Sequence, residues 1–206
     1  MTQDAYAHQF LNWIKARLDE MDATLTLIEK STAVLHADAK KQAEEIIAQI
    51  GARRKAFEET VRKQQPESEG AWAKTKTTLE ADWASFEAAV EDYVKNSPLS
   101  AQERVAVFKA RAEAQRKGWG ETISALQKKA GMAAAEGKQD FDAALSHLKQ
   151  QADEAKAKLE ARQKAGSESW ADFKTALQES RAAFDKASQK TLESYEVDPF
   201  MFIQNL

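Results

Sequence analysis

The residue type in this chain that could most readily bind a metal or transfer a proton is histidine, and there are three: His8, His36 and His147. Helical di-iron and di-manganese sites use Glu-x-x-His pairs that face the interior of a bundle. Alanine stands three positions before each of these histidines. The chain has no cysteine and no His-x-x-x-His pair, so the ligands of a zinc site are missing as well. We predict no metal, no cofactor, and histidines that face solvent or are half-buried.

Other catalytic patterns are also missing. The absence of cysteine excludes thiol catalysis, and no Gly-x-x-x-x-Gly-Lys sequence is present to bind phosphate. Serines and threonines occur mainly at expected helix ends or on polar helix faces, where capping explains them. We therefore predict a protein that is not an enzyme.

Two features could bind a partner. Gly118 and Gly120 flank Trp119, although glycine inside a helix costs about 1 kcal/mol relative to alanine. Close packing of a neighbouring helix, or a kink at the indole, would explain the glycines, and a ligand or partner docking on an exposed Trp119 is the alternative.

The second feature is the apolar C-terminal segment 197–206, which follows a polar helix and leaves the helical register at Pro199. It either covers the end of the bundle as a plug or inserts into another protein or a membrane surface. Its candidate partner-binding residues are Phe200, Met201, Phe202 and Ile203.

These candidates sit on a strongly helical background. The 206 residues include only 7 Gly and 3 Pro, and 31% are charged. Leu11, Leu18 and Leu25 recur at intervals of seven, and Ile14 and Met21 follow three residues after the first two. This spacing places both series on one helical face. Similar stripes run along the rest of the chain, which predicts an all-α antiparallel bundle or coiled coil.

An internal duplication is indicated by an ungapped shift of 98 residues. Under this shift Trp72 matches Trp170, and the break at 65–70 coincides with the break near Gly166. Helical periodicity alone does not align the breaks. The matched apolar pairs are Phe10 and Phe108, Ile28 and Leu126, Ile47 and Leu145, Ile50 and Leu148, Val61 and Leu159, Leu79 and Leu177, and Phe86 and Phe184.

Two architectures fit these breaks. If turns occur near 31–33 and 129–131, each half holds three helices, about 4–30, 33–64 and 69–96, then 99–129, 138–164 and 168–196. The units are then residues 1–98 and 99–196, followed by the segment 197–206. If those turns are absent, two very long helices are each followed by a shorter one. The first architecture is favoured, and it resembles three-helix repeat arrays of the spectrin type in period and plan, with no diagnostic motif shared.

Composition narrows the function. The net charge of −3, with basic and acidic residues interspersed, argues against a nucleic-acid partner. No signal peptide or spanning segment is evident, so a cytoplasmic location is expected. We predict a helical scaffold or adaptor that binds protein partners through helix packing and self-associates. The alternative is an amphipathic coat protein on a lipid body, storage granule or membrane surface, similar in composition to phasins and apolipoproteins.

Overall fold

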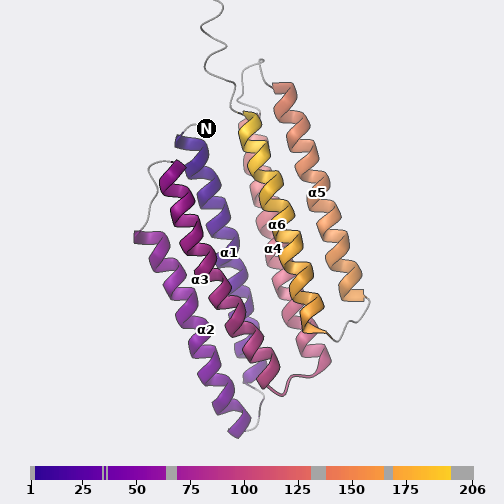
Figure 1. Cartoon of the computed structure of the whole chain (residues 1–206). Helices are drawn as coiled ribbons and strands as arrows, with labels where there is room; N and C mark the ends of the chain where they lie inside the picture. The colour runs from indigo at the N-terminus through magenta and orange to yellow at the C-terminus, as the bar shows by residue number, and fades with distance from the viewer. Residues whose placement is uncertain are drawn as a thin grey trace, which may run out of the picture.

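The computed structural model describes residues 3–33, 35, 37–63, 69–130, 138–164 and 169–195. These residues form six α-helices that alternate in direction, and no strand occurs among them (Figure 1). The helices are α1 (Gln3–Thr32), α2 (Ala37–Lys63), α3 (Glu69–Asn96), α4 (Ala101–Ala130), α5 (Lys138–Lys164) and α6 (Trp170–Tyr195). The all-α prediction is confirmed.

The helix boundaries decide between the two predicted architectures. Helix α1 ends at Thr32 and α2 begins at Ala37, while α4 ends at Ala130 and α5 begins at Lys138. The alternative with two very long helices is therefore wrong. The start of α4 follows from local sequence, because the Glu103 amide donates to Ser100 Oγ at 3.2 Å and the Ser100 amide donates to the Glu103 carboxylate at 2.7 Å. This reciprocal pair is a capping box.

The helices are arranged as two sets of three, side by side. We call α1–α3 the first half and α4–α6 the second half. Helix α1 packs against α4 at the centre, α2 contacts α1 and α3 on one flank, and α5 contacts α4 and α6 on the other (Figure 1). Helices α2, α1, α4 and α5 form a row, and α3 and α6 lie on one face of that row (Figure 1). The chain passes from one half to the other between Asn96 and Ala101, where the predicted unit boundary falls. The duplication itself stays a prediction.

The core follows the apolar stripes read from the sequence. Most of the matched apolar pairs with both members among the described side chains are buried in both halves. Buried pairs include Ile50 and Leu148, Leu79 and Leu177, and Phe86 and Phe184. On α1 the series Ile14, Met21 and Ile28 is buried, whereas Leu11 is 59% exposed. The two heptad series of α1 are therefore not equally covered.

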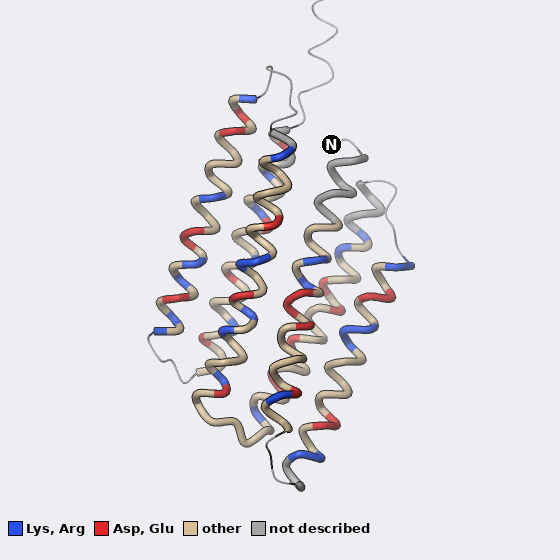
Figure 2. The backbone as a smooth tube through the Cα atoms, turned by 180° about the vertical axis from the view of Figure 1, so that it is seen from behind, with Lys and Arg blue, Asp and Glu red and all other residues tan. Residues whose placement is uncertain are grey.

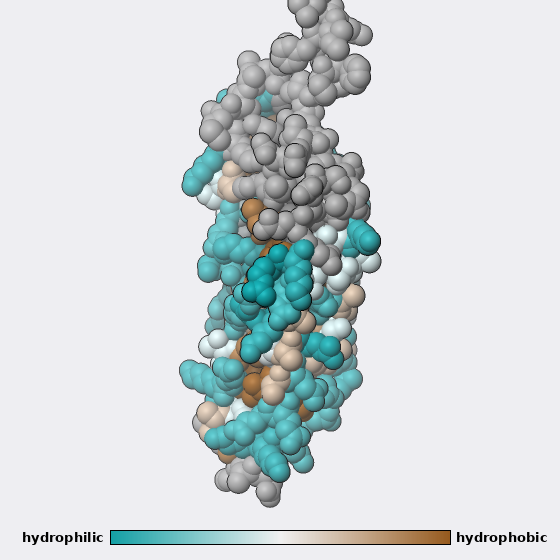
Figure 3. Space-filling view, turned by 90° about the vertical axis from the view of Figure 1, so that its left-hand side faces the viewer, coloured by the Kyte–Doolittle hydropathy of each residue, from teal (hydrophilic) through white to brown (hydrophobic). Residues whose placement is uncertain are grey.

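The described surface is mixed in charge and poor in large apolar side chains. Lysine and arginine alternate with aspartate and glutamate along the helices (Figure 2). The flank that carries α2 is mainly hydrophilic, with small separate apolar areas (Figure 3). Leu11 is the one large hydrophobic side chain in the described part of the chain that is exposed. None of the helices in this part combines the length and apolar character that a bilayer-spanning segment needs.

Candidate functional site

Trp119 lies inside the bundle rather than on its surface. Its side chain is only 4% exposed, and its ring stacks on Phe184 of α6 with the centroids 5.2 Å apart. The alternative that a ligand or partner docks on an exposed Trp119 is therefore wrong. The physical reason is that a stripe of large rings at helical spacing is worth most when buried, at roughly 1.5–3 kcal/mol for each side chain.

The two glycines beside Trp119 have different environments. A Cβ built on Gly118 would lie 3.1 Å from Cβ of Ala16, so the missing side chain allows α1 and α4 to approach closely. A Cβ on Gly120 would meet no atom within 4 Å. Close helix packing, one of the two predicted explanations, thus accounts for Gly118 but not for Gly120.

The remaining predicted sites are only partly described. His147 is exposed, as expected, while the side chains of His8 and His36 lie outside the described residues. The candidate partner-binding residues Phe200, Met201, Phe202 and Ile203 also lie outside them. Among the described residues, no group of three or more histidines, aspartates or glutamates could hold a metal ion.

Four buried charged residues meet where the two halves join, and we call them the inner cluster. They are Glu20 from α1, Glu87 from α3, Arg111 from α4 and Arg181 from α6. Arg111 donates from Nε to Glu20 at 2.8 Å and from Nη2 to Glu87 at 2.9 Å. Arg181 donates from Nη2 to both oxygens of Glu20, at 2.9 and 3.1 Å. Each half therefore supplies one sign of charge, with both acids in the first half and both bases in the second.

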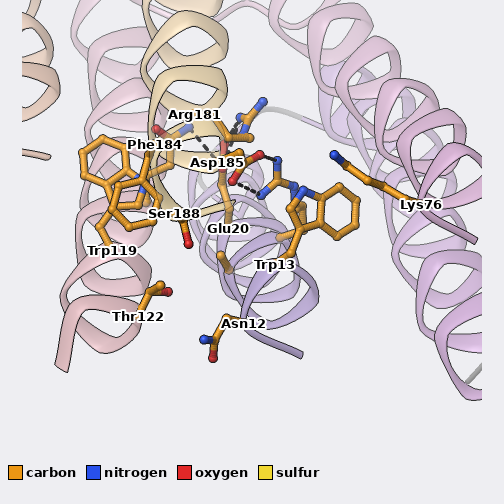
Figure 4. A pocket seen from close by; sticks show the side chains of 13 residues that line it. Asn12, Trp13, Glu20, Lys76, Trp119, Thr122, Arg181, Phe184, Asp185 and Ser188 are labelled. Carbon is orange, nitrogen blue, oxygen red and sulfur yellow. Dashed lines mark hydrogen bonds and ion pairs between the residues drawn. The ribbon is translucent and has the colours of Figure 1, made fainter. Parts of the chain in front are cut away.

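Aromatic rings and a further ion pair surround the inner cluster. Arg17 pairs with Asp185 of α6, and its guanidinium lies 4.1 Å from the ring centroid of Trp13. Arg181 lies 4.4 Å from the ring centroid of Trp83. Figure 4 shows Trp13 on the opposite side of this site from Trp119. Cation–π contacts of this kind strengthen as water is excluded.

A polar extension continues the cluster along α4 and α6. The Gln115 amide donates to Glu20 at 3.2 Å and to the backbone carbonyl of Leu177 at 3.2 Å. Its carbonyl oxygen accepts a hydrogen bond from Ser180 at 3.1 Å. The network thus includes a side chain of α4 that is hydrogen-bonded to the backbone of α6. This bond restricts the position of α6 relative to α4 in addition to the ion pairs.

The electrostatics of the cluster favour the ionised form of Glu87. Burial alone would raise the pKa of Glu87, but the charges of Arg111 and Arg181 outweigh burial, and the pKa lies below its usual range. Burial would also lower the pKa of Arg111, yet Glu20 and Glu87 together raise it. The pKa of Arg181 is lowered, because burial is joined by repulsion from Arg17 and Arg111.

The sequence patterns described above do not predict the inner cluster, although one signal for it is present. The 98-residue shift pairs Trp13 with Arg111 and Trp83 with Arg181, so arginine in one half stands where the other half has a large core residue. A charged side chain at a core position implies a buried partner of opposite sign. Finding Glu20 and Glu87 as those partners required the helices to be placed in space.

These contacts can hold helices in register, and they leave no acid in the inner cluster without a cationic neighbour. A carboxylate that accepts from arginines and has a lowered pKa is a poor proton donor or acceptor near neutral pH. No known family model, curated protein sequence or solved structure matches this chain.

Proposed function

We propose that this protein is a non-enzymatic helical scaffold or adaptor that binds protein partners through its outer helices and self-associates. The observation that carries the proposal is the inner cluster, whose four members come from α1, α3, α4 and α6. Because each half supplies one sign of charge, rotation or sliding of one half against the other would break several buried ion pairs at once. The cluster therefore supports a single rigid body.

A rigid body of this kind holds two helix surfaces at a set separation. Helices α2 and α5 have 27 residues each and lie on opposite flanks (Figure 1). Each has many exposed charged residues, through which polar helix-to-helix contacts with a protein can form. A scaffold works by presenting such surfaces in a constant geometry, which is the role that the buried charges favour.

A distance measurement between the flanks tests the rigidity that the proposal needs. Gln49 on α2 and His147 on α5 are exposed and are paired by the 98-residue shift. Spin labels on Gln49→Cys and His147→Cys should give one narrow distance distribution, because the chain has no other cysteine. The matched variant Arg181→Gln should broaden that distribution. A broad distribution in the labelled protein with Arg181 intact would contradict the proposal.

Association is tested separately. Sedimentation equilibrium should show self-association, and cross-linking from α2 and α5 in cells should recover protein partners from at least one flank. A strict monomer without cross-linked partners would count against a scaffold.

The coat-protein alternative requires the bundle to open, because the described surface exposes one large apolar side chain, Leu11. Distances between the labelled flanks that widen when lipid droplets are added, together with flotation of the protein, would replace the scaffold proposal with that alternative.

A further inference from the structure

An open groove runs between α3 and α6, on the face of the molecule that these two helices cover. It has a volume of about 410 Å³, and Trp13 and Arg17 of α1 line it as well. The Gln178 amide of α6 donates to Glu87 of α3 at 2.9 Å across one end of the groove. Because Glu87 belongs to the inner cluster, the groove leads from the surface to the edge of that cluster.

The groove carries more positive charge than its acids balance. Three acids line it, and each has a cationic partner: Glu80, Glu87 and Asp185. Four cations line it: Arg17, Lys76, Arg181 and Lys186. Within the described part of the chain, Lys186 has no acidic partner. The groove therefore has a surplus cation, which favours a ligand of negative charge.

Hydrogen-bond donors are also in surplus at the groove. Three buried donors there have no acceptor among the described residues: Arg17 Nε, Trp83 Nε1 and Arg181 Nε. Their side chains are at most 7% exposed. A buried donor without an acceptor is unfavourable, and native structures usually supply one. The groove is thus suited to a ligand that brings oxygen acceptors together with negative charge.

We propose that the α3–α6 groove binds a small soluble phosphate ester, with the phosphate within reach of Lys76 and Lys186. The ammonium end of Lys76 points from α3 towards the side of the site where Trp13 and Asp185 lie (Figure 4). The two lysines stand on opposite walls, since Lys76 belongs to α3 and Lys186 to α6. The inference is independent of the proposed scaffold function.

The free donors favour a phosphate over a carboxylate. Both Nη atoms of Arg17 donate to Asp185, and those of Arg181 donate to acids of the inner cluster. The two-pronged guanidinium face that binds a planar carboxylate is therefore occupied on both arginines. Single N–H groups and lysine ammonium groups remain, and these suit the several oxygens of a tetrahedral phosphate, which lysine binds as a point charge.

The size of the groove indicates the rest of the ligand. A water molecule in the liquid takes up about 30 Å³, so 410 Å³ corresponds to roughly a dozen waters. This is more space than one phosphate group fills, and it leaves room for a short organic chain. The groove is lined by buried side chains such as Trp13 and Trp83, so a ligand has to enter between the helices to reach them. A free small molecule can do so, whereas a flat phospholipid surface cannot.

Titration calorimetry of the full chain with glycerol 3-phosphate, at constant ionic strength, tests the proposal. We expect saturable binding of one ligand per chain, with a Kd of about 1 mM or tighter. Lys76→Gln and Lys186→Gln should each raise the Kd at least about fivefold, which corresponds to about 1 kcal/mol. The matched controls are Lys74→Gln and Lys190→Gln, which remove exposed charges from the same two helices outside the groove. They should change the Kd less than about twofold.

NMR of the indole N–H groups locates the ligand. The Trp83 resonance, assigned from its loss in Trp83→Phe, should shift as glycerol 3-phosphate is added. The Trp170 resonance should not, because Trp170 does not line the groove. Circular dichroism checks that each variant keeps its helices.

Four results would each overturn the proposal. They are no saturable binding at about 10 mM ligand, equal weakening by all four lysine variants, binding of succinate as tight as that of glycerol 3-phosphate, and an unshifted Trp83 resonance. Flotation with phosphatidic acid vesicles, without binding of glycerol 3-phosphate, would replace the soluble ligand with a membrane surface and would overturn it as well.

Discussion

Replacing Arg181 by methionine should cause a large loss of stability. Arg181 is 7% exposed and donates to Glu20 and Glu87, while Arg111 donates to the same two acids. With both arginines present, two positive charges face two negative charges. Without Arg181, two buried carboxylates share one arginine, and one negative charge is uncompensated. Removing one partner of a buried ion pair costs about 3–5 kcal/mol.

We expect Arg181→Met to lower the free energy of unfolding by about 3–5 kcal/mol, which for a chain of this size lowers Tm by roughly 6–20 °C. Urea unfolding followed by circular dichroism measures the change. The control is Lys63→Met, which removes an exposed cation 3.4 Å from Glu59. This control should change the free energy by at most about 0.5 kcal/mol.

The double variant Glu87→Gln with Arg181→Met separates charge balance from lost packing. It returns the inner cluster to one acid and one base, Glu20 and Arg111, so its loss of stability should be clearly smaller than the sum of the two single losses. A double loss equal to that sum would show that the four charges do not act together. A loss below about 1 kcal/mol for Arg181→Met alone would refute the reasoning outright.

The single variant Arg181→Met also changes how the stability of the protein responds to acid. The pKa of Glu87 lies below its usual value in the folded protein, so its contribution to stability is complete above the usual carboxyl pKa and is lost as the pH falls through the folded pKa. Removing Arg181 takes away one of the charges that lower this pKa. The folded and unfolded pKa values of Glu87 then lie closer together, so Arg181→Met should lose less of its unfolding free energy on acidification than the unchanged protein does, in unfolding free energies measured across the acid range.

Three further predictions concern other contacts. In urea unfolding, Gly120→Ala should raise the free energy of unfolding by about 0.5–1 kcal/mol, because its Cβ meets no atom within 4 Å. Gly118→Ala should lower the free energy of unfolding, because its Cβ lies 3.1 Å from Cβ of Ala16 on the neighbouring helix. Hydrogen bonds from Lys174 and Lys95 lower the pKa of Glu91 to about 2, and Lys174→Met should move its NMR titration midpoint up towards 4.5. Phe57→Ala should cost about 3–5 kcal/mol in thermal unfolding, because that ring is fully buried.

Local patterns determined the helices and most of the core. Intervals of three and four bring apolar side chains to one helical face regardless of what covers that face, so Leu79, Phe86, Leu177 and Phe184 could be assigned to the interior from their spacing. Breakers act locally too, which is why the six helices begin and end within a few residues of the predicted limits. The interior position of Trp119 also follows from this spacing, and its flanking glycines left an exposed Trp119 only as the alternative to close helix packing.

The tertiary structure alone decided which charged residues are buried together. Glu20 and Arg181 are 161 residues apart in the chain, and their contact depends on how α1 and α6 are rotated and placed around α4. Periodicity states which face of a helix must be covered, whereas the choice of the helix that covers it rests on long-range packing, and so does the inner cluster.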